Sequence, residues 1–97
     1  MLDEITSRMG AAVAKANFPH QVKFDFGTDG KVFIDGPAKT VTNEDSEAIT
    51  TISVGIDDFV KMAQGKLSAP LAFMSGKLKV AGDMGVAMQI GPLLDNA

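Results

Sequence analysis

Few residues of this sequence have the types and spacing that catalysis requires. The chain has one histidine, His20, and no cysteine, so a Ser-His-Asp arrangement would have to use His20, and a thiolate nucleophile is excluded. His20 lies between Pro19 and Gln21, at the predicted junction of a helix and a strand, where a histidine is far more often a surface residue than a base. We therefore expect no enzymatic activity and assign no catalytic residue.

The acidic residues lack the spacing of a metal site. Asp57 and Asp58 are adjacent, and each has a simpler role at the start of a helix, Asp57 as the N-cap and Asp58 as a first-turn acid. The acidic stretch 44–47 could hold calcium weakly, but it lacks the spaced oxygens and the glycine of an EF-hand loop, which favours a solvated loop. The ten glycines form no phosphate-binding motif. We expect no metal and no cofactor.

The composition excludes further classes of function. The 97 residues include nine Lys and Arg against twelve Asp and Glu, for a net charge of −3, whereas a nucleic-acid-binding domain usually has a clustered basic surplus. Lys77 and Lys79 share one side of a predicted strand, which is typical of a solvated edge. No apolar run approaches the roughly 18 residues of a membrane span, and no signal peptide is recognisable. We expect one domain over residues 1–97, located in the cytoplasm and without a nucleic-acid partner.

The hydrophobic periodicity predicts an α+β fold. Apolar residues at spacings of three and four, with capping and stop signals, predict four helices; they cover residues 2–16, 58–64, 69–75 and 84–90, the last one ended by Gly91 and Pro92. Alternating and β-branched residues predict five strands; they lie near residues 22–27, 31–35, 39–42, 48–54 and 77–80. Strands joined by short turns pair antiparallel, and the fifth strand, which follows a helical crossover, could lie parallel to a neighbour.

The alternation in the strands gives the predicted sheet one apolar face and one solvated face. The helices are expected to cover the apolar face. Phe33 is the exception to the pattern, because it shares the solvated face with Lys31 and Asp35. Either a neighbouring side chain covers Phe33, or the residue marks a surface patch for a partner.

The last predicted helix is more apolar than a surface helix requires. Gln89 is its strongly polar residue, and apolar residues occupy both of its faces; they are Met84, Val86, Ala87, Met88 and Ile90. Such a helix is buried on several sides or contacts an apolar ligand. The methionines of this half of the chain are flexible and can repack around ligands of different shape; they are Met62, Met74, Met84 and Met88. An ordinary core filled by these side chains explains the pattern at least as well.

The stretch FMSGKLKVAGDMGVAMQI, residues 73–90, resembles the signature of the sterol carrier protein (type 2) family. The preceding DDFVKMAQGKLSAPLAF matches the helices that come before this signature in the same family, and the order of elements agrees along essentially the whole chain. The resemblance implies a five-stranded, mostly antiparallel sheet with helices on one face, enclosing an apolar tunnel. It also implies non-catalytic binding and intracellular transfer of sterols, fatty acids, fatty acyl-CoA or phospholipids.

The resemblance further implies which residues line the tunnel. By motif position, the last helix is the main part of the wall, and the segments just before it adjoin the tunnel. The candidate lipid-binding residues are Phe59, Met62, Phe73, Met74, Val80, Met84, Ala87, Met88, Leu93 and Leu94.

An alternative hypothesis is an interaction module with little or no lipid binding. In that case the apolar C-terminal half is buried in a homodimer or docked on a lipid-metabolising enzyme. Members of the family occur alone or fused to enzymes of lipid oxidation, so the resemblance implies a possible enzyme partner and transient membrane contact. The chain ends in Leu94-Asp95-Asn96-Ala97, without the peroxisomal address of many eukaryotic members, which favours a bacterial, stand-alone, cytoplasmic domain. The sequence leaves both a monomer and a homodimer open.

Overall fold

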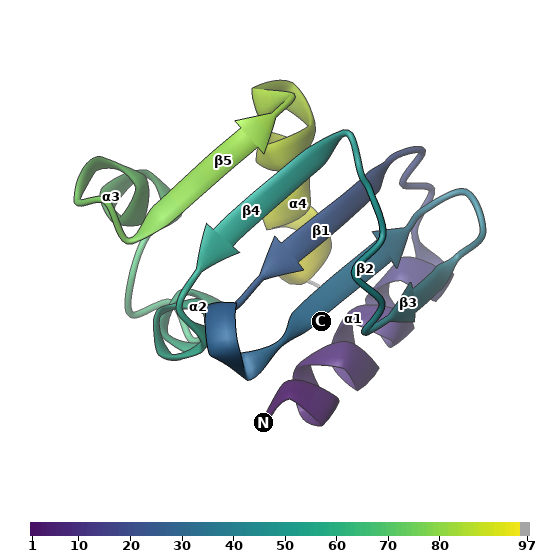
Figure 1. Cartoon of the computed structure of the whole chain (residues 1–97), viewed down its shortest axis with the longest axis horizontal. Helices are drawn as coiled ribbons and strands as arrows, with labels where there is room; N and C mark the ends of the chain where they lie inside the picture. The colour runs from purple at the N-terminus through teal and green to yellow at the C-terminus, as the bar shows by residue number, and fades with distance from the viewer. Residues whose placement is uncertain (96–97) are drawn as a thin grey trace.

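The computed structural model describes the backbone of residues 1–95 and the side chains of residues 1–90. Its elements, shown in Figure 1, are α1 (Leu2–Lys15), β1 (Gln21–Asp25), η1 (Gly27–Asp29), β2 (Lys31–Asp35), β3 (Thr40–Thr42), β4 (Thr50–Val54), α2 (Ile56–Ala63), α3 (Ala69–Met74), β5 (Leu78–Gly82) and α4 (Met84–Asp95). The α+β class and the order of helices and strands confirm the prediction from the sequence. Within residues 1–95, the helices all fall short of the length and hydropathy that a membrane-spanning helix needs.

The strands form one mixed sheet in the order β3-β2-β1-β4-β5 (Figure 1). Antiparallel pairs join β1 to β2 and β2 to β3. Residues 43–49 then carry the chain back along the sheet, so that β4 starts at the same end as β1 and pairs parallel with it. The chain reverses through α2 and α3, so β5 pairs antiparallel with β4. The expectation of a parallel fifth strand is therefore wrong, because the long return that produces a parallel pair precedes β4.

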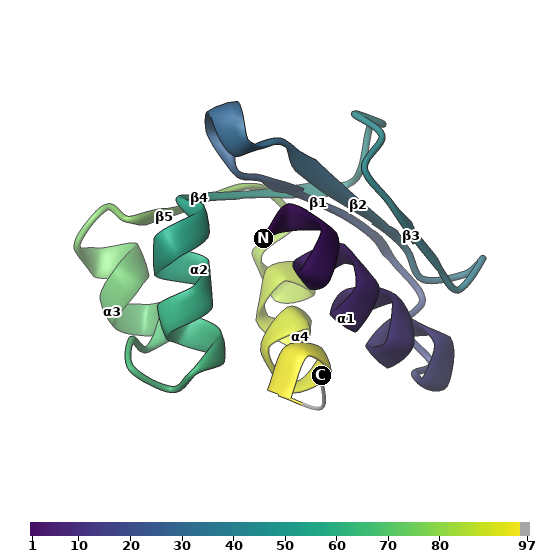
Figure 2. The same ribbon diagram turned by 90° about the horizontal axis from the view of Figure 1, so that it is seen from below.

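The four α-helices lie on one side of the sheet, as Figure 2 shows. Helix α1 packs against β2, β3 and α4, whereas α4 packs against β4 and β5. Under β1 and β2 the core is solid, since Met9 and Val13 of α1 meet Val22, Val32 and Ile34, all at most 2% exposed. This half of the protein is filled by its own side chains.

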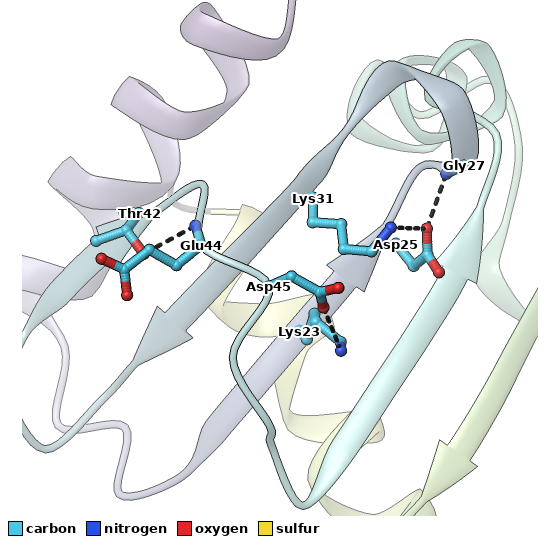
Figure 3. A network of polar contacts seen from close by, with 7 residues as sticks. All are labelled: Lys23, Asp25, Gly27, Lys31, Thr42, Glu44 and Asp45. Atoms are coloured by element: carbon cyan, nitrogen blue, oxygen red, sulfur yellow. Dashed lines mark hydrogen bonds and ion pairs between the residues drawn. The ribbon is translucent and has the colours of Figure 1, made fainter.

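The segment of residues 43–49 crosses the face of the sheet that the helices leave free (Figures 1 and 3). The Nζ of Lys23 donates to Oδ1 of Asp45 at 2.7 Å, which holds the segment across β1. Phe33 lies on this face, opposite Lys23 in the sheet register, and is only 8% exposed. Phe33 is therefore covered by the protein itself, and the alternative of an exposed patch at this residue is wrong.

Asp25 organises the turn between β1 and β2 (Figure 3). Its Oδ1 accepts hydrogen bonds from the backbone N–H of Gly27 at 2.9 Å and from Nζ of Lys31 at 3.2 Å. The Gly27 N–H, together with the Lys31 ammonium, outweighs partial burial and lowers the pKa of Asp25 below its ordinary value of 3.8.

This lowered pKa predicts a loss of stability in acid. The folded state holds the Asp25 proton more weakly than the unfolded state, so the stabilisation is complete above pH 3.8 and is lost as the pH falls through the folded pKa. We expect the free energy of unfolding of Asp25→Asn to be lower at neutral pH and to fall less steeply in acid. Urea midpoints measured against pH check this, with the exposed turn residue Asp29 replaced by asparagine as control. Equal acid dependence of Asp25→Asn and the wild type would contradict it.

Two helix ends differ from the sequence prediction. Gly55 is the N-cap of α2, which begins at Ile56. Asp57 is therefore not the N-cap; it joins Asp58 in the first turn, where both carboxylates interact favourably with the helix dipole. The backbone turns directly from β4 into α2, which starts the helix earlier than its acidic residues suggest. Helix α4 continues to Asp95, so the prediction that Gly91 and Pro92 end it is wrong. A proline φ is compatible with a helix, and the lost hydrogen bond and the crowding of the preceding turn can kink a helix without ending it.

Candidate functional site

A cavity of about 250 Å³ lies under β4 and β5, between the sheet and helices α2, α3 and α4. Helix α1 contributes no lining residue; it lies under β2 and β3, away from α2 and α3 (Figure 2). Every side chain that the structure describes in its wall is apolar. The lining residues are Phe24, Ile52, Val54, Phe59, Met62, Ala69, Pro70, Phe73, Leu78, Val80, Met84, Ala87, Met88 and Ile90.

The sheet contributes a flat apolar wall to the cavity. Phe24, Ile52 and Val80 are aligned across β1, β4 and β5 by the sheet register, and Val54 pairs with Leu78. These residues face the helices because side chains alternate between the two faces of a strand. The alternation therefore fixes the composition of this wall.

Phe59 closes the cavity at the buried side of α2. Its ring meets the rings of Phe24 and Phe26 edge to face, with centroid distances of 5.4 and 5.3 Å, which is a favoured aromatic geometry. Phe59 is 6% exposed. Phe24 and Phe59 thus line the inner end of the cavity, and Phe26 packs against both of their rings.

The opposite side of the cavity is open to solvent between α3 and α4. Phe73, Met84 and Met88 line the cavity and are nevertheless exposed, Met88 to 74%. Methionine side chains are unbranched and polarizable, so they adapt to ligands of different shape. We call this open side the mouth of the cavity. Its methionine side chains can change conformation more easily than the buried phenylalanine rings at the inner end.

The structure brings together most of the residues that the sequence assigned to the site. Met74 is not among the lining residues and is 82% exposed on α3. Leu93 and Leu94 fall within α4, but their side chains lie outside the described residues. The other seven of the ten line the cavity; they are Phe59, Met62, Phe73, Val80, Met84, Ala87 and Met88.

The sequence prediction omitted half of the wall. Phe24, Ile52 and Val54 belong to it, and strand alternation placed them on the apolar face without showing which part of that face stays uncovered. Ala69 and Pro70, in the first turn of α3, carry no signal that distinguishes them from surface residues. Ser68 caps this turn, because its Oγ accepts from the N–H of Leu71 at 3.2 Å.

The chemistry that this wall supports is the burial of hydrocarbon. The described lining residues offer neither a titratable group nor a nucleophile. His20 is not one of them, and its ring packs edge-on against Phe18 at a centroid distance of 5.6 Å. Among the residues that the structure describes, no three metal-ligating side chains lie close enough to hold an ion.

Comparison with known sequences matches nearly the whole chain to one family. The SCP-2 sterol transfer family matches residues 6–95. Hydroxysteroid dehydrogenase-like protein 2 of Bos taurus is 47% identical over 49 residues, which are 50% of this chain and 12% of that protein. Peroxisomal multifunctional enzyme A of Dictyostelium discoideum is 47% identical over 47 residues, which are 48% of this chain and 11% of that enzyme. The matched region is thus a small part of these curated relatives.

Comparison with solved structures identifies the same fold. The crystal structure of sterol carrier protein 2-like 2 from Aedes aegypti has a TM-score of 0.81 at 17% identity and covers 94% of both chains. The solution structure of sterol carrier protein 2 from Aedes aegypti in complex with palmitate has a TM-score of 0.80 at 19% identity, over 97% of this chain and 94% of that one. Sterol carrier protein 2 from Yarrowia lipolytica, in its apo form, has a TM-score of 0.69 at 25% identity, over 97% and 79% of the two chains.

Proposed function

Because this chain belongs to the SCP-2 sterol transfer family, we propose that it binds the hydrocarbon part of a lipid in the cavity between the sheet and helices α2, α3 and α4 and transfers the lipid between membranes. The observation that carries the proposal is the apolar character of every described side chain in the wall. Burial of apolar surface is the driving force of such binding, and it needs no charged partner inside the cavity.

The free energy gained by burying an acyl chain is sufficient for micromolar binding. An acyl chain of about 16 carbons contributes a gross transfer free energy on the order of 10 kcal/mol, at roughly 0.8 kcal/mol per buried methylene. Ordering the chain and losing translational freedom offset several kcal/mol of this. Micromolar binding follows from burial alone, with little discrimination between chains that differ by one methylene.

The dimensions of the cavity favour a lipid with one acyl chain. Its volume of about 250 Å³ lies just below the roughly 300–1,000 Å³ of typical ligand pockets. A flexible acyl chain fits a narrow space and can be accommodated further by Met62, Met84 and Met88, whereas a fused sterol ring system or two acyl chains need more preformed volume. We therefore place fatty acids and fatty acyl-CoA ahead of sterols and phospholipids; the palmitate complex of the Aedes aegypti protein supports this order.

The proposed role of the chain is to present lipid to enzymes, without a chemical step of its own. Two of its curated relatives are named as a dehydrogenase-like protein and a multifunctional enzyme, and this chain matches only 12% and 11% of them. A lipid-metabolising enzyme is accordingly the proposed recipient. The cytoplasmic location, the bacterial origin, the single domain and the oligomeric state stay predictions.

A fluorescent fatty acid titrated into the protein in vesicle-free solution tests the proposal. We expect saturation at one ligand per chain with low-micromolar affinity, and displacement by palmitate at lower concentration than by cholesterol. Native mass spectrometry of the purified protein would show a copurified lipid and name it. Absence of binding, together with a concentration-dependent dimer in sedimentation, would favour the interaction module instead.

A further inference from the structure

The charges of this chain are distributed unevenly. Residues 59–82 hold four lysines and no acidic residue, whereas the rest of the chain holds five basic and twelve acidic residues. Lys61, Lys66, Lys77 and Lys79 are all exposed, and none takes part in the ion pairs found among the described residues. Residues 59–82 are therefore a basic segment of an acidic chain.

Most of the exposed apolar side chains lie in or directly after this basic segment. Five of the seven exposed large hydrophobic residues that the structure describes lie on α3 and α4. Leu71, Phe73 and Met74 belong to α3, and Met84 and Met88 belong to α4 across the cavity mouth. An apolar cluster of this kind on a surface marks an interaction site.

The lysines bracket the apolar helix. The N–H of Lys66 donates to the carbonyl oxygen of Lys61 at 2.8 Å, where α2 leads into α3, and the N–H of Lys77 donates to the carbonyl oxygen of Ala72 at 2.9 Å, where α3 leads into β5. Helix α3 lies at one extremity of the molecule, beyond α2 and away from α1 (Figure 2). Leu71 and Met74 point away from the cavity, since neither lines it.

We propose that α3 is the surface by which this protein docks on an anionic lipid bilayer. Leu71, Phe73 and Met74 enter the boundary between head groups and acyl chains, and the flanking lysines contact the anionic head groups. The inference deepens the proposed function and rests on it for its purpose, because docking by α3 brings the cavity mouth to the bilayer and lets a lipid enter without crossing water.

Charge favours a bilayer over a second copy of this chain. A two-fold dimer centred on α3 would bring Lys66 and Lys77, which flank this helix, near the same lysines of the second copy, and like charges opposed across an interface are costly. An anionic membrane surface instead attracts lysines close to it. The flexible apolar side chains of α3 insert into disordered lipid without needing a complementary shape.

The test is binding to phosphatidylcholine vesicles with and without phosphatidylglycerol, measured by cosedimentation. We expect the wild type to bind the anionic vesicles more tightly, with an affinity that falls as salt rises. The double variant Lys66→Glu, Lys77→Glu should bind about 25-fold more weakly or worse, from about fivefold per lysine near a membrane surface. The variant Leu71→Ser, Met74→Ser should also bind more weakly.

The matched control is Arg8→Glu, Lys15→Glu, two exposed residues of α1 whose reversal changes the net charge equally. This control should bind vesicles as the wild type does within about twofold, a change that corresponds to less than half of a kcal/mol. Equal losses in both charge-reversal variants, or a loss only in the α1 variant, would overturn docking by α3. A dimer that Leu71→Ser, Met74→Ser abolishes, with vesicle binding unchanged, would also overturn it and identify a second copy as the occupant.

Fatty-acid binding in vesicle-free solution separates this inference from the proposed function. The Lys66→Glu, Lys77→Glu variant should keep the wild-type affinity for the fluorescent fatty acid, because neither lysine lines the cavity. Loss of vesicle binding with retained fatty-acid binding supports docking by α3. Vesicle binding that depends on these lysines in a protein that binds no fatty acid would leave the docking surface standing and refute the lipid cavity.

Discussion

Replacing Ala87 with phenylalanine should weaken lipid binding at least a hundredfold while the protein stays folded. Ala87 is a half-buried residue of α4 whose side chain lines the cavity. An apolar protein cavity of about 150 Å³ holds a benzene molecule, so the added ring takes up a substantial part of the cavity of about 250 Å³. The ring stays in an apolar environment, which limits its effect on the free energy of unfolding.

The expected loss of affinity for Ala87→Phe is a hundredfold or more. Excluding about four methylenes at roughly 0.8 kcal/mol each removes about 3 kcal/mol of binding free energy. The measurement is displacement of a fluorescent fatty acid, with circular dichroism to establish the fold. Gln89→Phe is the matched control, because it introduces the same side chain at an exposed position of the same helix that does not line the cavity. Unchanged affinity in Ala87→Phe would show that lipids bind elsewhere.

Replacing Phe59 with alanine should lower the free energy of unfolding by a large fraction of its total. The substitution removes the ring that packs against Phe24 and Phe26 at 5.4 and 5.3 Å and extends an existing cavity rather than leaving a small one that can collapse. Truncations of this kind cost about 3–5 kcal/mol, against a total of roughly 5–15 kcal/mol for a domain. Urea unfolding monitored by circular dichroism measures the change.

A bound lipid should partly rescue Phe59→Ala. A ligand that binds only the folded state raises the free energy of unfolding by about 2.7 kcal/mol at a concentration a hundred times its dissociation constant. Because the enlarged cavity has room for more methylenes, saturating palmitate should stabilise Phe59→Ala more than the wild type. Phe33→Ala is the matched control, since Phe33 is equally buried but lies on the opposite face of the sheet. Equal stabilisation of both variants would contradict the assignment of Phe59 to the binding cavity.

The sequence predicted the elements of this fold well, because their signals are local. Alternation in VKFDF placed Val22 and Phe24 on the inner face, and both are buried. Asp83, a typical N-cap residue, directly precedes α4, and its Oδ1 accepts from the N–H of Val86 at 3.2 Å. Capping and alternation depend on residues a few positions apart, which is why a single sequence contains them.

The non-local features of the structure could not be predicted in the same way. The parallel pairing of β1 with β4 depends on the path of residues 43–49 over the sheet, and the Lys23–Asp45 ion pair that fixes this path joins two residues that share no sequence pattern. The apolar pattern likewise predicted that β1 and β4 face inward, but not that α1 fills its half of the core and leaves the other half hollow. The resemblance of residues 73–90 to a family supplied that part of the prediction.

The parallel pairing at the centre of the sheet also has a consequence for how the chain acquires its structure. Strand β1 gains a second neighbour only when β4 arrives from the other half of the sequence, and the closure of such long loops slows folding. During synthesis on a ribosome, one edge of β1 is therefore expected to stay unpaired, and Phe24 to stay uncovered by Phe59, until residues 50–82 have emerged. In that interval the nascent chain is most prone to aggregate, so the late segment that forms most of the cavity wall also ends the period in which aggregation is most favoured.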